Sequence, residues 1–297
     1  LNITPADVEH ELQHARHKLL ALRAQRTTPG LDDNILTSWN ALLIAGLCQA
    51  ARCLDDPTLI DAACTATDQL RQSAWREGRL YAVYAGGKTQ HPAYLDDHAF
   101  LLAALLELLQ TRWRSSDLTW AIELAEILLE RFSDEERGGF YFTANDHETL
   151  IHRSKTFVDE AIPSGNAIAA QSLFRLGYLL GESRYIQAAE RTLRADWTSV
   201  QDHPSSHASL LIALSEYLQA PQLIIIRGAS EEALEWQRSL NQLYKPDRLV
   251  FAIPPEAELP NNLASKTAAE QTRAYVCQGT QCGAPVHSLE ALIALGR

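Results

Sequence analysis

The sequence predicts a mainly α-helical protein that repeats one unit, a buried helix followed by an amphipathic helix, and that ends in a small α/β unit. Three observations predict this class. Four segments are apolar around the whole helical circumference, so other helices must cover them; these segments begin near Asn40, His98, Asn166 and His207. Helices with one apolar face alternate with them. After Ala220-Pro221 the pattern changes to β-branched runs.

The bulk composition is that of a globular protein. With 297 residues, of which 46% are hydrophobic and 21% charged, the chain is long enough for a large core and a small extra domain. A net charge of −11 leaves no basic stripe for phosphate groups, so we expect no nucleic-acid and no membrane partner. No apolar run approaches the roughly 20 residues that a membrane span requires, and no basic region followed by an apolar one opens the sequence. Five cysteines fit a reducing compartment, so a cytoplasmic location is expected.

The chain begins with Leu1 and contains no methionine. We therefore expect it to be a piece of a longer protein.

The first elements follow from caps, periodicity and turns. Thr4-Pro5-Ala6-Asp7 opens a capped helix that ends before Pro29-Gly30, and residues 41–47 form the first buried helix. An amphipathic helix follows Asp55-Asp56-Pro57. Alternating residues from Gly78 to Lys88 then predict a β-hairpin.

The middle of the chain repeats this order. We expect a buried helix at 99–109, an amphipathic helix from Ser115, a second hairpin over 138–152, and a third buried helix from Ala167. Residues 183–197 are amphipathic and 208–214 are apolar. Such a repeat predicts a helical array that either closes into a ring of inner and outer helices or remains an open solenoid.

The C-terminal part, residues 221–297, predicts a small α/β unit that covers one side of the helical part, residues 1–220. Strands are expected at 223–226, 249–253 and 274–276, and helices at 231–243 and 288–295. Because a helix separates the first two strands, we expect these strands to be parallel.

Paired acids precede three of the buried helices: Asp32-Asp33, Asp96-Asp97 and Asp159-Glu160. One interpretation is helix capping, worth about 1 kcal/mol for each cap. Two adjacent acids exceed what one cap requires, however, and a ring brings helix N-termini to one rim. Carboxylates gathered there can divide into a proton donor and a base, as glycosidic or epimerase chemistry requires. We therefore predict Asp96, Asp97, Asp159 and Glu160 as catalytic residues.

Aromatic and polar side chains stand beside these acids, a mixture that suits a polyol. Packing in the core is at least an equal alternative for Trp39, and a structural role is an alternative for His98 as well. In the functional interpretation His98 shuttles a proton or donates a hydrogen bond. The predicted ligand-binding residues are Trp39, Asn40, Tyr94, His98, Ser164 and Asn166.

No metal and no cofactor are expected. His203 and His207 lie four residues apart, but a third ligand is not evident. Cys277 and Cys282 have a four-residue spacer, unlike the two-residue spacer of redox motifs, so a buried structural pair is favoured over a redox role.

Five motifs in order resemble the C-terminal part of the thioredoxin-domain-containing proteins related to spermatogenesis-associated protein 20. The resemblance covers essentially the whole chain. Its motifs are Asp32–Asn40, Tyr94–Phe100, Gly138–Tyr141, Asp159–Asn166 and Ala274–Cys282.

The resemblance implies an (α/α) toroid of inner and outer helices, similar to N-acylglucosamine 2-epimerase and the six-hairpin glycosidases. Here it implies a partial six-hairpin barrel with short β-hairpins and a small C-terminal α/β unit. The first part of the ring and an upstream thioredoxin-like domain, a partner in the full-length chain, would be missing. The chain departs from the family at His98, where the family usually has Tyr, so a role at this position does not carry over directly.

Two functions follow as hypotheses. The first is a carbohydrate-active site at the mouth of the toroid, which binds a small polar or sugar ligand and performs epimerisation or hydrolysis by acid–base catalysis. The alternative is a non-catalytic binding or scaffold module for the thioredoxin-like domain. Transfer of activity from the sugar enzymes is an analogy at the level of the fold.

Overall fold

The computed structural model describes residues 4–295. The chain divides into two compact units, residues 1–34 and residues 35–297. In the first unit, helix α1 (Pro5–Arg23) begins at Thr4, whose hydroxyl accepts a hydrogen bond from the Asp7 backbone N–H, as the capping pattern predicts. Its side chains are exposed, including Leu12 and Leu19.

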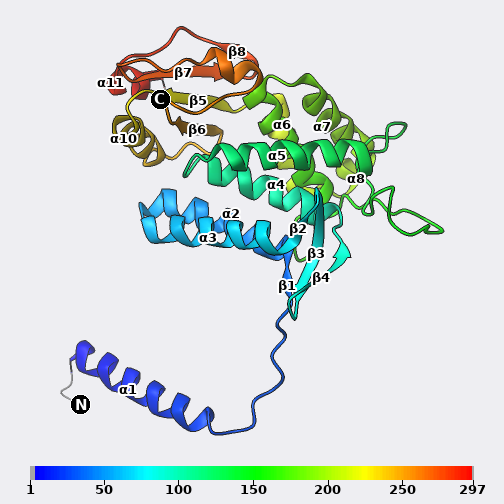
Figure 1. Ribbon diagram of the computed structural model, residues 1–297, viewed down its shortest axis with the longest axis vertical. Helices are drawn as coiled ribbons and strands as arrows, with labels where there is room; N and C mark the ends of the chain where they lie inside the picture. The colour runs from blue at the N-terminus through cyan, green and yellow to red at the C-terminus, as the bar shows by residue number, and fades with distance from the viewer. Residues whose placement is uncertain (1–3, 296–297) are drawn as a thin grey trace. The chain divides into compact units, whose positions relative to one another are not determined.

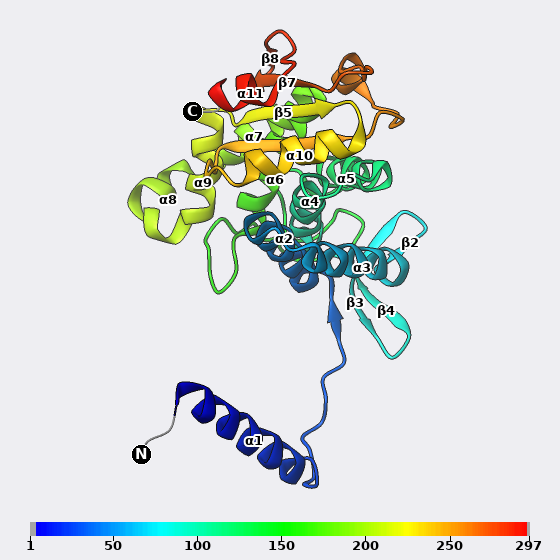
Figure 2. The ribbon, with the colours of Figure 1, turned by 90° about the vertical axis from the view of Figure 1, so that its left-hand side faces the viewer.

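The second unit is built on helical hairpins (Figures 1 and 2). Its inner helices pack in the order α2, α4, α6 and α9, and three of them carry an outer helix, α3, α5 or α7. The inner helices are α2 (Thr37–Leu54), α4 (Leu95–Leu109), α6 (Gly165–Leu180) and α9 (Ala208–Leu218). The outer helices are α3 (Pro57–Ala74), α5 (Ser115–Ile127, continued by η1, Leu128–Phe132) and α7 (Ser183–Ala195). This arc of inner and outer helices confirms the predicted fold class, a partial α/α toroid.

The four inner helices are not buried equally. Helices α4 and α6 each have inner neighbours on both sides, and nearly all of their side chains are buried. Helices α2 and α9 lie at the two ends of the array, where Leu43 is 57% exposed and Ile212 is 53% exposed. The prediction of burial on every side is therefore wrong for α2 and α9, because an end helix has one inner neighbour among the described residues.

Short connections join these helices. The predicted first hairpin is confirmed as β3 (Arg79–Ala85) and β4 (Lys88–Pro92), turning at Gly86-Gly87. Strands β1 (Ile35–Leu36) and β2 (Trp75–Arg76) pair with β3. Helix α8 (Trp197–Asp202) and the 3-10 turn η2 (Pro204–His207) precede α9.

The predicted second hairpin over residues 138–152 is wrong. This loop forms one isolated bridge, between Ser133 and Phe140, and the Asn166 side chain binds both backbone groups of Phe140. The Asp134 carboxylate accepts the N–H groups of Glu136 and Arg137 and binds Lys155 Nζ at 2.6 Å. Side-chain contacts and an isolated bridge therefore stand in place of a strand ladder.

The C-terminal part is a mixed sheet with strand order β6-β5-β7-β8. Strand β5 pairs in parallel with β6, as predicted, and antiparallel with β7. The helical array covers one face of the sheet, and α10 and α11 cover the other. These elements are β5 (Gln222–Arg227), α10 (Ser230–Asn241), β6 (Arg248–Ile253), η3 (Asn261–Ser265), β7 (Arg273–Gln278), β8 (Gln281–Cys282) and α11 (Leu289–Leu295).

None of the helices in residues 4–295 combines the length and the apolar character that a membrane crossing requires.

Candidate functional site

Asp97 joins the starts of two inner helices. Its Oδ2 accepts the backbone N–H of Tyr94 at 2.9 Å at the start of α4, and its Oδ1 accepts the backbone N–H of Ser38 at 3.0 Å at the start of α2. The side chain is buried, and burial raises the pKa of Asp97 to about 6, although the two N–H donors favour the ionised form. One carboxylate thus caps both helices.

Asp159 makes the same kind of joint between the next two inner helices. Its Oδ1 accepts the Ser164 N–H at 2.9 Å at the start of α6, and its Oδ2 accepts the Ser209 N–H at 2.8 Å at the start of α9. Both oxygens of Asp97 and of Asp159 are therefore engaged with backbone donors. This geometry matches the capping interpretation of these two acids.

Asp96 has a different environment. Its carboxylate accepts no hydrogen bond from the described residues and lies against the first residue of α6, since a Cβ added to Gly165 would be 2.1 Å from Asp96 Oδ1. Burial, and then the negative charge of Asp97, raise the pKa of Asp96 to about 6. A carboxyl group with this pKa can release and accept protons near neutral pH.

Asp96 and Glu160 line one cavity of about 210 Å³ at the N-terminal ends of α4 and α6. Glu160 is exposed, whereas Asp96 is half-buried. The other lining residues are Leu95, Phe142, Thr156, Val158, Ile162, Pro163, Ser164 and Gly165. Of the four predicted catalytic residues, the structure brings Asp96 and Glu160 to a common cavity.

Two of the predicted ligand-binding residues belong to this region. Ser164 lines the cavity, although its hydroxyl already donates to the Thr156 carbonyl at 3.0 Å. Tyr94 stacks on Phe142 with ring centroids 4.9 Å apart, and Phe142 in turn lines the cavity. Phe142 is therefore the aromatic side chain of the cavity lining, and Tyr94 contacts it without lining the cavity itself.

The other predicted ligand-binding residues lie apart from the cavity. Asn166 is fully buried, and its amide binds the backbone of Phe140 and Thr156. His98 is buried against Phe132, its Nδ1 lies 2.8 Å from the Tyr94 carbonyl, and burial lowers its pKa to about 4. Asn40 donates to the Leu36 carbonyl at 2.8 Å.

Trp39 is 63% exposed, which excludes the core position that the sequence left open as an alternative. It does not line the cavity beside Asp96.

Sequence reasoning missed Phe142, Thr156 and Gly165 as parts of the site. Phe142 and Thr156 come from the region in and after the loop that was predicted to be a hairpin, and no local motif marks them. The sequence did contain an indication of the role of Gly165, because a glycine at the first position of a buried helix leaves room for another group to approach the backbone.

A larger cavity, of about 620 Å³, lies at the opposite ends of the inner helices. It is enclosed by the C-terminal end of α2, the start of α3, the turn after α4, and helix α10 with the end of β6. Three arginines and one carboxylate line it, namely Arg52, Arg112, Arg238 and Asp55. Its residues come from widely separated stretches of the chain, so no motif identifies it.

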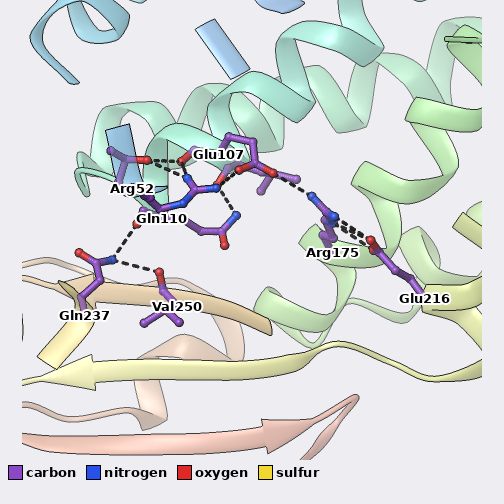
Figure 3. Close-up of polar contacts among 9 residues, drawn as sticks. Arg52, Glu107, Gln110, Arg175, Glu216, Gln237 and Val250 are labelled. Carbon is purple, nitrogen blue, oxygen red and sulfur yellow. Dashed lines mark hydrogen bonds and ion pairs between the residues drawn. The ribbon is translucent and has the colours of Figure 1, made fainter. Parts of the chain in front are cut away.

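A buried charge network ends at this cavity (Figure 3). Glu107 of α4 pairs with Arg52 of α2 and with Arg175 of α6 at 3.0 Å, and Arg175 pairs with Glu216 of α9 at 2.7 Å. Burial alone would raise the pKa of Glu107, but the guanidinium groups of Arg52 and Arg175 hold it below its ordinary value. The network links all four inner helices.

Within residues 4–295, no group of three or more His, Cys, Asp or Glu side chains is placed to hold a metal ion.

Comparisons with known proteins give relatives along nearly the whole chain. No family model matches. An uncharacterized protein of Caenorhabditis elegans is 27% identical over 303 residues, which cover 98% of this chain and 41% of that protein. Human spermatogenesis-associated protein 20 is 26% identical over 294 residues, which cover 93% of this chain and 37% of the human protein. The chain thus spans about two fifths of the length of these relatives.

Solved structures with some similarity include carbohydrate epimerases and glycosidases. The cellobiose 2-epimerase of Spirochaeta thermophila has a TM-score of 0.47 and 20% identity, covering 55% of this chain and 43% of that one. The GH76 α-mannanase BT2949 of Bacteroides thetaiotaomicron has a TM-score of 0.48 and 11% identity, covering 73% of this chain and 58% of that one.

The rat protein named spermatogenesis-associated protein 20 is 25% identical over 288 residues. The resemblance predicted from the five motifs is therefore confirmed: this chain is a homologue of the proteins named spermatogenesis-associated protein 20.

Proposed function

We propose that the cavity beside Asp96 binds a sugar or another small polyol, and that Asp96 and Glu160 exchange protons with it in an epimerase-like or glycosidase-like reaction. The observation that carries this proposal is the state of Asp96: a half-buried carboxyl with a pKa of about 6 and no hydrogen-bond donor among the described residues. A carboxyl group that only capped a helix would accept backbone N–H groups, as Asp97 does.

The surroundings of Asp96 suit this ligand class. Phe142 provides an aromatic ring for the C–H face of a sugar, while Thr156 and Ser164 provide polar atoms for its hydroxyls. Glu160, on the same cavity, supplies a second and more exposed carboxylate. One acid with a raised pKa and one solvated carboxylate are the pair that general acid–base catalysis requires.

The test is isothermal titration of the protein with a panel of mono- and disaccharides, followed by NMR of any sugar that binds. Epimerisation exchanges a ring proton for solvent deuterium, and hydrolysis releases a reducing end. We expect Asp96→Asn to abolish turnover while leaving the circular dichroism spectrum unchanged. Glu123→Gln, an exposed acid on α5, is the matched control. Absence of saccharide binding across the panel, or turnover that survives in Asp96→Asn, would refute the proposal.

The 620 Å³ cavity favours a second candidate, a non-catalytic binding module. Its volume is in the range of small-molecule sites, and its arginines suit an organic anion. Binding in this cavity would survive in the double variant Asp96→Asn with Glu160→Gln. It would be lost in Leu234→Trp, which fills the cavity from α10. The double variant and Leu234→Trp therefore distinguish binding in the 620 Å³ cavity from binding beside Asp96.

A further inference from the structure

The cysteine pair of the C-terminal sheet is asymmetric. Cys277 of β7 and Cys282 of β8 face each other across the strands and form a disulfide. Cys277 is 3% exposed, but Cys282 is exposed. The prediction of a pair is confirmed, but the prediction that both members are buried is wrong for Cys282.

The backbone already holds this region together without the disulfide. Strand β7 pairs with β5 along six residues, from Arg273 to Gln278. The Gly283 N–H donates to the Val276 carbonyl at 2.9 Å, so the returning strand is fixed beside the bond. A disulfide restricts the unfolded chain less as the loop it closes becomes shorter, and this one has a sequence separation of 5. Opening it therefore costs the fold less than opening a disulfide that closes a long loop.

Lys266 places a positive charge beside the exposed Cys282 sulfur. Its Nζ lies 3.3 Å from Cys282 Sγ and 5.5 Å from the centre of the Tyr275 ring. The Tyr275 hydroxyl donates to the Thr267 carbonyl at 3.0 Å, which fixes the ring beside the ammonium group. An adjacent lysine favours the thiolate over the thiol, and the thiolate is the nucleophile in disulfide exchange.

We propose that Cys282 and Cys277 form a thiol–disulfide exchange site, with Cys282 as the nucleophile, Cys277 as the resolving cysteine, and an accessible disulfide of a small molecule or unfolded peptide as the substrate. The substrate disulfide reacts with the exposed Cys282 sulfur, which lies beside Lys266. The buried Cys277 sulfur lies next to Cys282.

The exchange balances in two steps. The Cys282 thiolate attacks one sulfur of the substrate disulfide, which breaks the substrate S–S bond, forms a mixed disulfide and releases the first substrate thiolate. The Cys277 thiolate then attacks Cys282 Sγ, which forms the Cys277–Cys282 disulfide and releases the second thiolate. The substrate gains two electrons and the protein loses two. Two equivalents of a low-molecular-weight thiol, attacking first at Cys282, restore the dithiol.

The first test measures alkylation rates on the reduced protein. Iodoacetamide labelling followed by mass spectrometry reports each cysteine, and exposed Cys53 is the internal reference for access. At pH 7 we expect Cys282 to react about 10-fold faster than Cys53, because a lysine-paired thiol is more ionised. Lys266→Met should remove the difference and Lys266→Arg should retain it. Equal rates for Cys282 and Cys53 in the unsubstituted protein would overturn the proposal without any cysteine variant.

The second test traps the intermediate with oxidised glutathione as the probe. Cys277→Ser should accumulate a glutathione mixed disulfide at Cys282, because the resolving thiol is gone. Cys282→Ser should accumulate none at Cys277. Failure of Cys277→Ser to trap glutathione, or equal trapping at either cysteine, would count against the assigned roles.

Discussion

Asp96 and Asp97 are adjacent, but their carboxylates meet different groups. Asp97 bridges backbone N–H groups of two helices, whereas Asp96 lies in the cavity against Gly165. The repeat of the Asp97 joint at Asp159 indicates that one acid of each of these two pairs, Asp96-Asp97 and Asp159-Glu160, holds neighbouring helix starts together. The other acid of the two pairs, Asp96 or Glu160, lines the cavity.

The raised pKa of Asp96 predicts a stability change with a defined sign. The folded protein binds the Asp96 proton more tightly than the unfolded chain, whose Asp pKa is 3.8, so this group stabilises the fold at low pH. That contribution is lost as pH rises through about 6. Asp96→Asn should therefore raise the free energy of unfolding at pH 7 by about 1–3 kcal/mol and have little effect below pH 4.

Urea denaturation of both proteins at pH 4 and pH 7 measures this difference. A variant that is equally or less stable than the original protein at pH 7 would show that the Asp96 carboxylate is not destabilised by its surroundings. A gain in stability together with a loss of turnover is the pattern expected of a functional residue.

The bridging acid Asp159 should respond in the opposite way. Asp159→Ala leaves the helix-start N–H groups of Ser164 and Ser209 without their acceptor, so it should lower the free energy of unfolding at pH 7 by about 1–3 kcal/mol. Chemical denaturation measures the loss. Asp33→Ala, an exposed acid outside these joints, is the control and should change stability by less than about 0.5 kcal/mol.

The sequence shows that paired acids precede three of the inner helices. It does not show which acid of a pair bridges two helix starts and which one lines the cavity. The Ser38 N–H that selects Asp97 is 59 residues away, and the Ser209 N–H that selects Asp159 is 50 residues away. A pattern of adjacent acids contains no information on such distant donors. For the same reason Asn166 was assigned to a ligand, although the backbone of Phe140 and Thr156 uses its amide.

At the scale of the elements, the start of α6 shapes the candidate site. Gly165 opens this helix, and Asp96 Oδ1 occupies the space that a larger residue would need. Gly165→Ala should therefore displace the Asp96 carboxylate and reduce sugar turnover at least about 10-fold, because small misplacements of a catalytic group are costly. The helix itself should remain folded.

Gly46→Ala is the matched control for this substitution. Gly46 lies inside α2, and a methyl group added there would meet nothing within 4 Å, so alanine should stabilise the protein by about 0.5–1 kcal/mol and leave turnover unchanged. Turnover and thermal unfolding of both variants test the argument. Unchanged turnover in Gly165→Ala would show that the close approach of Asp96 to α6 is not required for function.

Helices and the first hairpin could be predicted because periodicity, caps and the Gly86-Gly87 turn are local signals. The loop over 138–152 could not, because its shape depends on side chains outside it. The Asn166 amide of α6 binds both backbone groups of Phe140, and the Arg153 guanidinium donates to the Thr143 carbonyl. These contacts depend on the tertiary structure, which a local pattern of alternating residues does not contain.

At the scale of the whole molecule, the sheet and the helical array share a core. Alternate residues of the strands divide between the two faces: Leu223, Ile225 and Phe251 pack with the helices, while Ile224, Ile226 and Val250 pack under α10 and α11. Gln237 of α10 reinforces the join, because its Nε2 donates to the carbonyls of Gln110 and Val250 (Figure 3). The predicted boundary between residues 220 and 221 remains a prediction, since composition reveals a change of pattern but not a shared core.

The shared core predicts that the array and the sheet unfold together. Native-state hydrogen exchange at increasing urea should give the amides of α4 and β5 the same free energy of opening. Phe251→Ala, in the strand β6 but packed in the helical core, should lower both values by about 3–5 kcal/mol. Leu43→Ala, an exposed position on α2, should change them by less than about 0.5 kcal/mol. If β5 instead opens at lower urea than α4, and Phe251→Ala affects the strands alone, residues 221–297 form a separately folding domain.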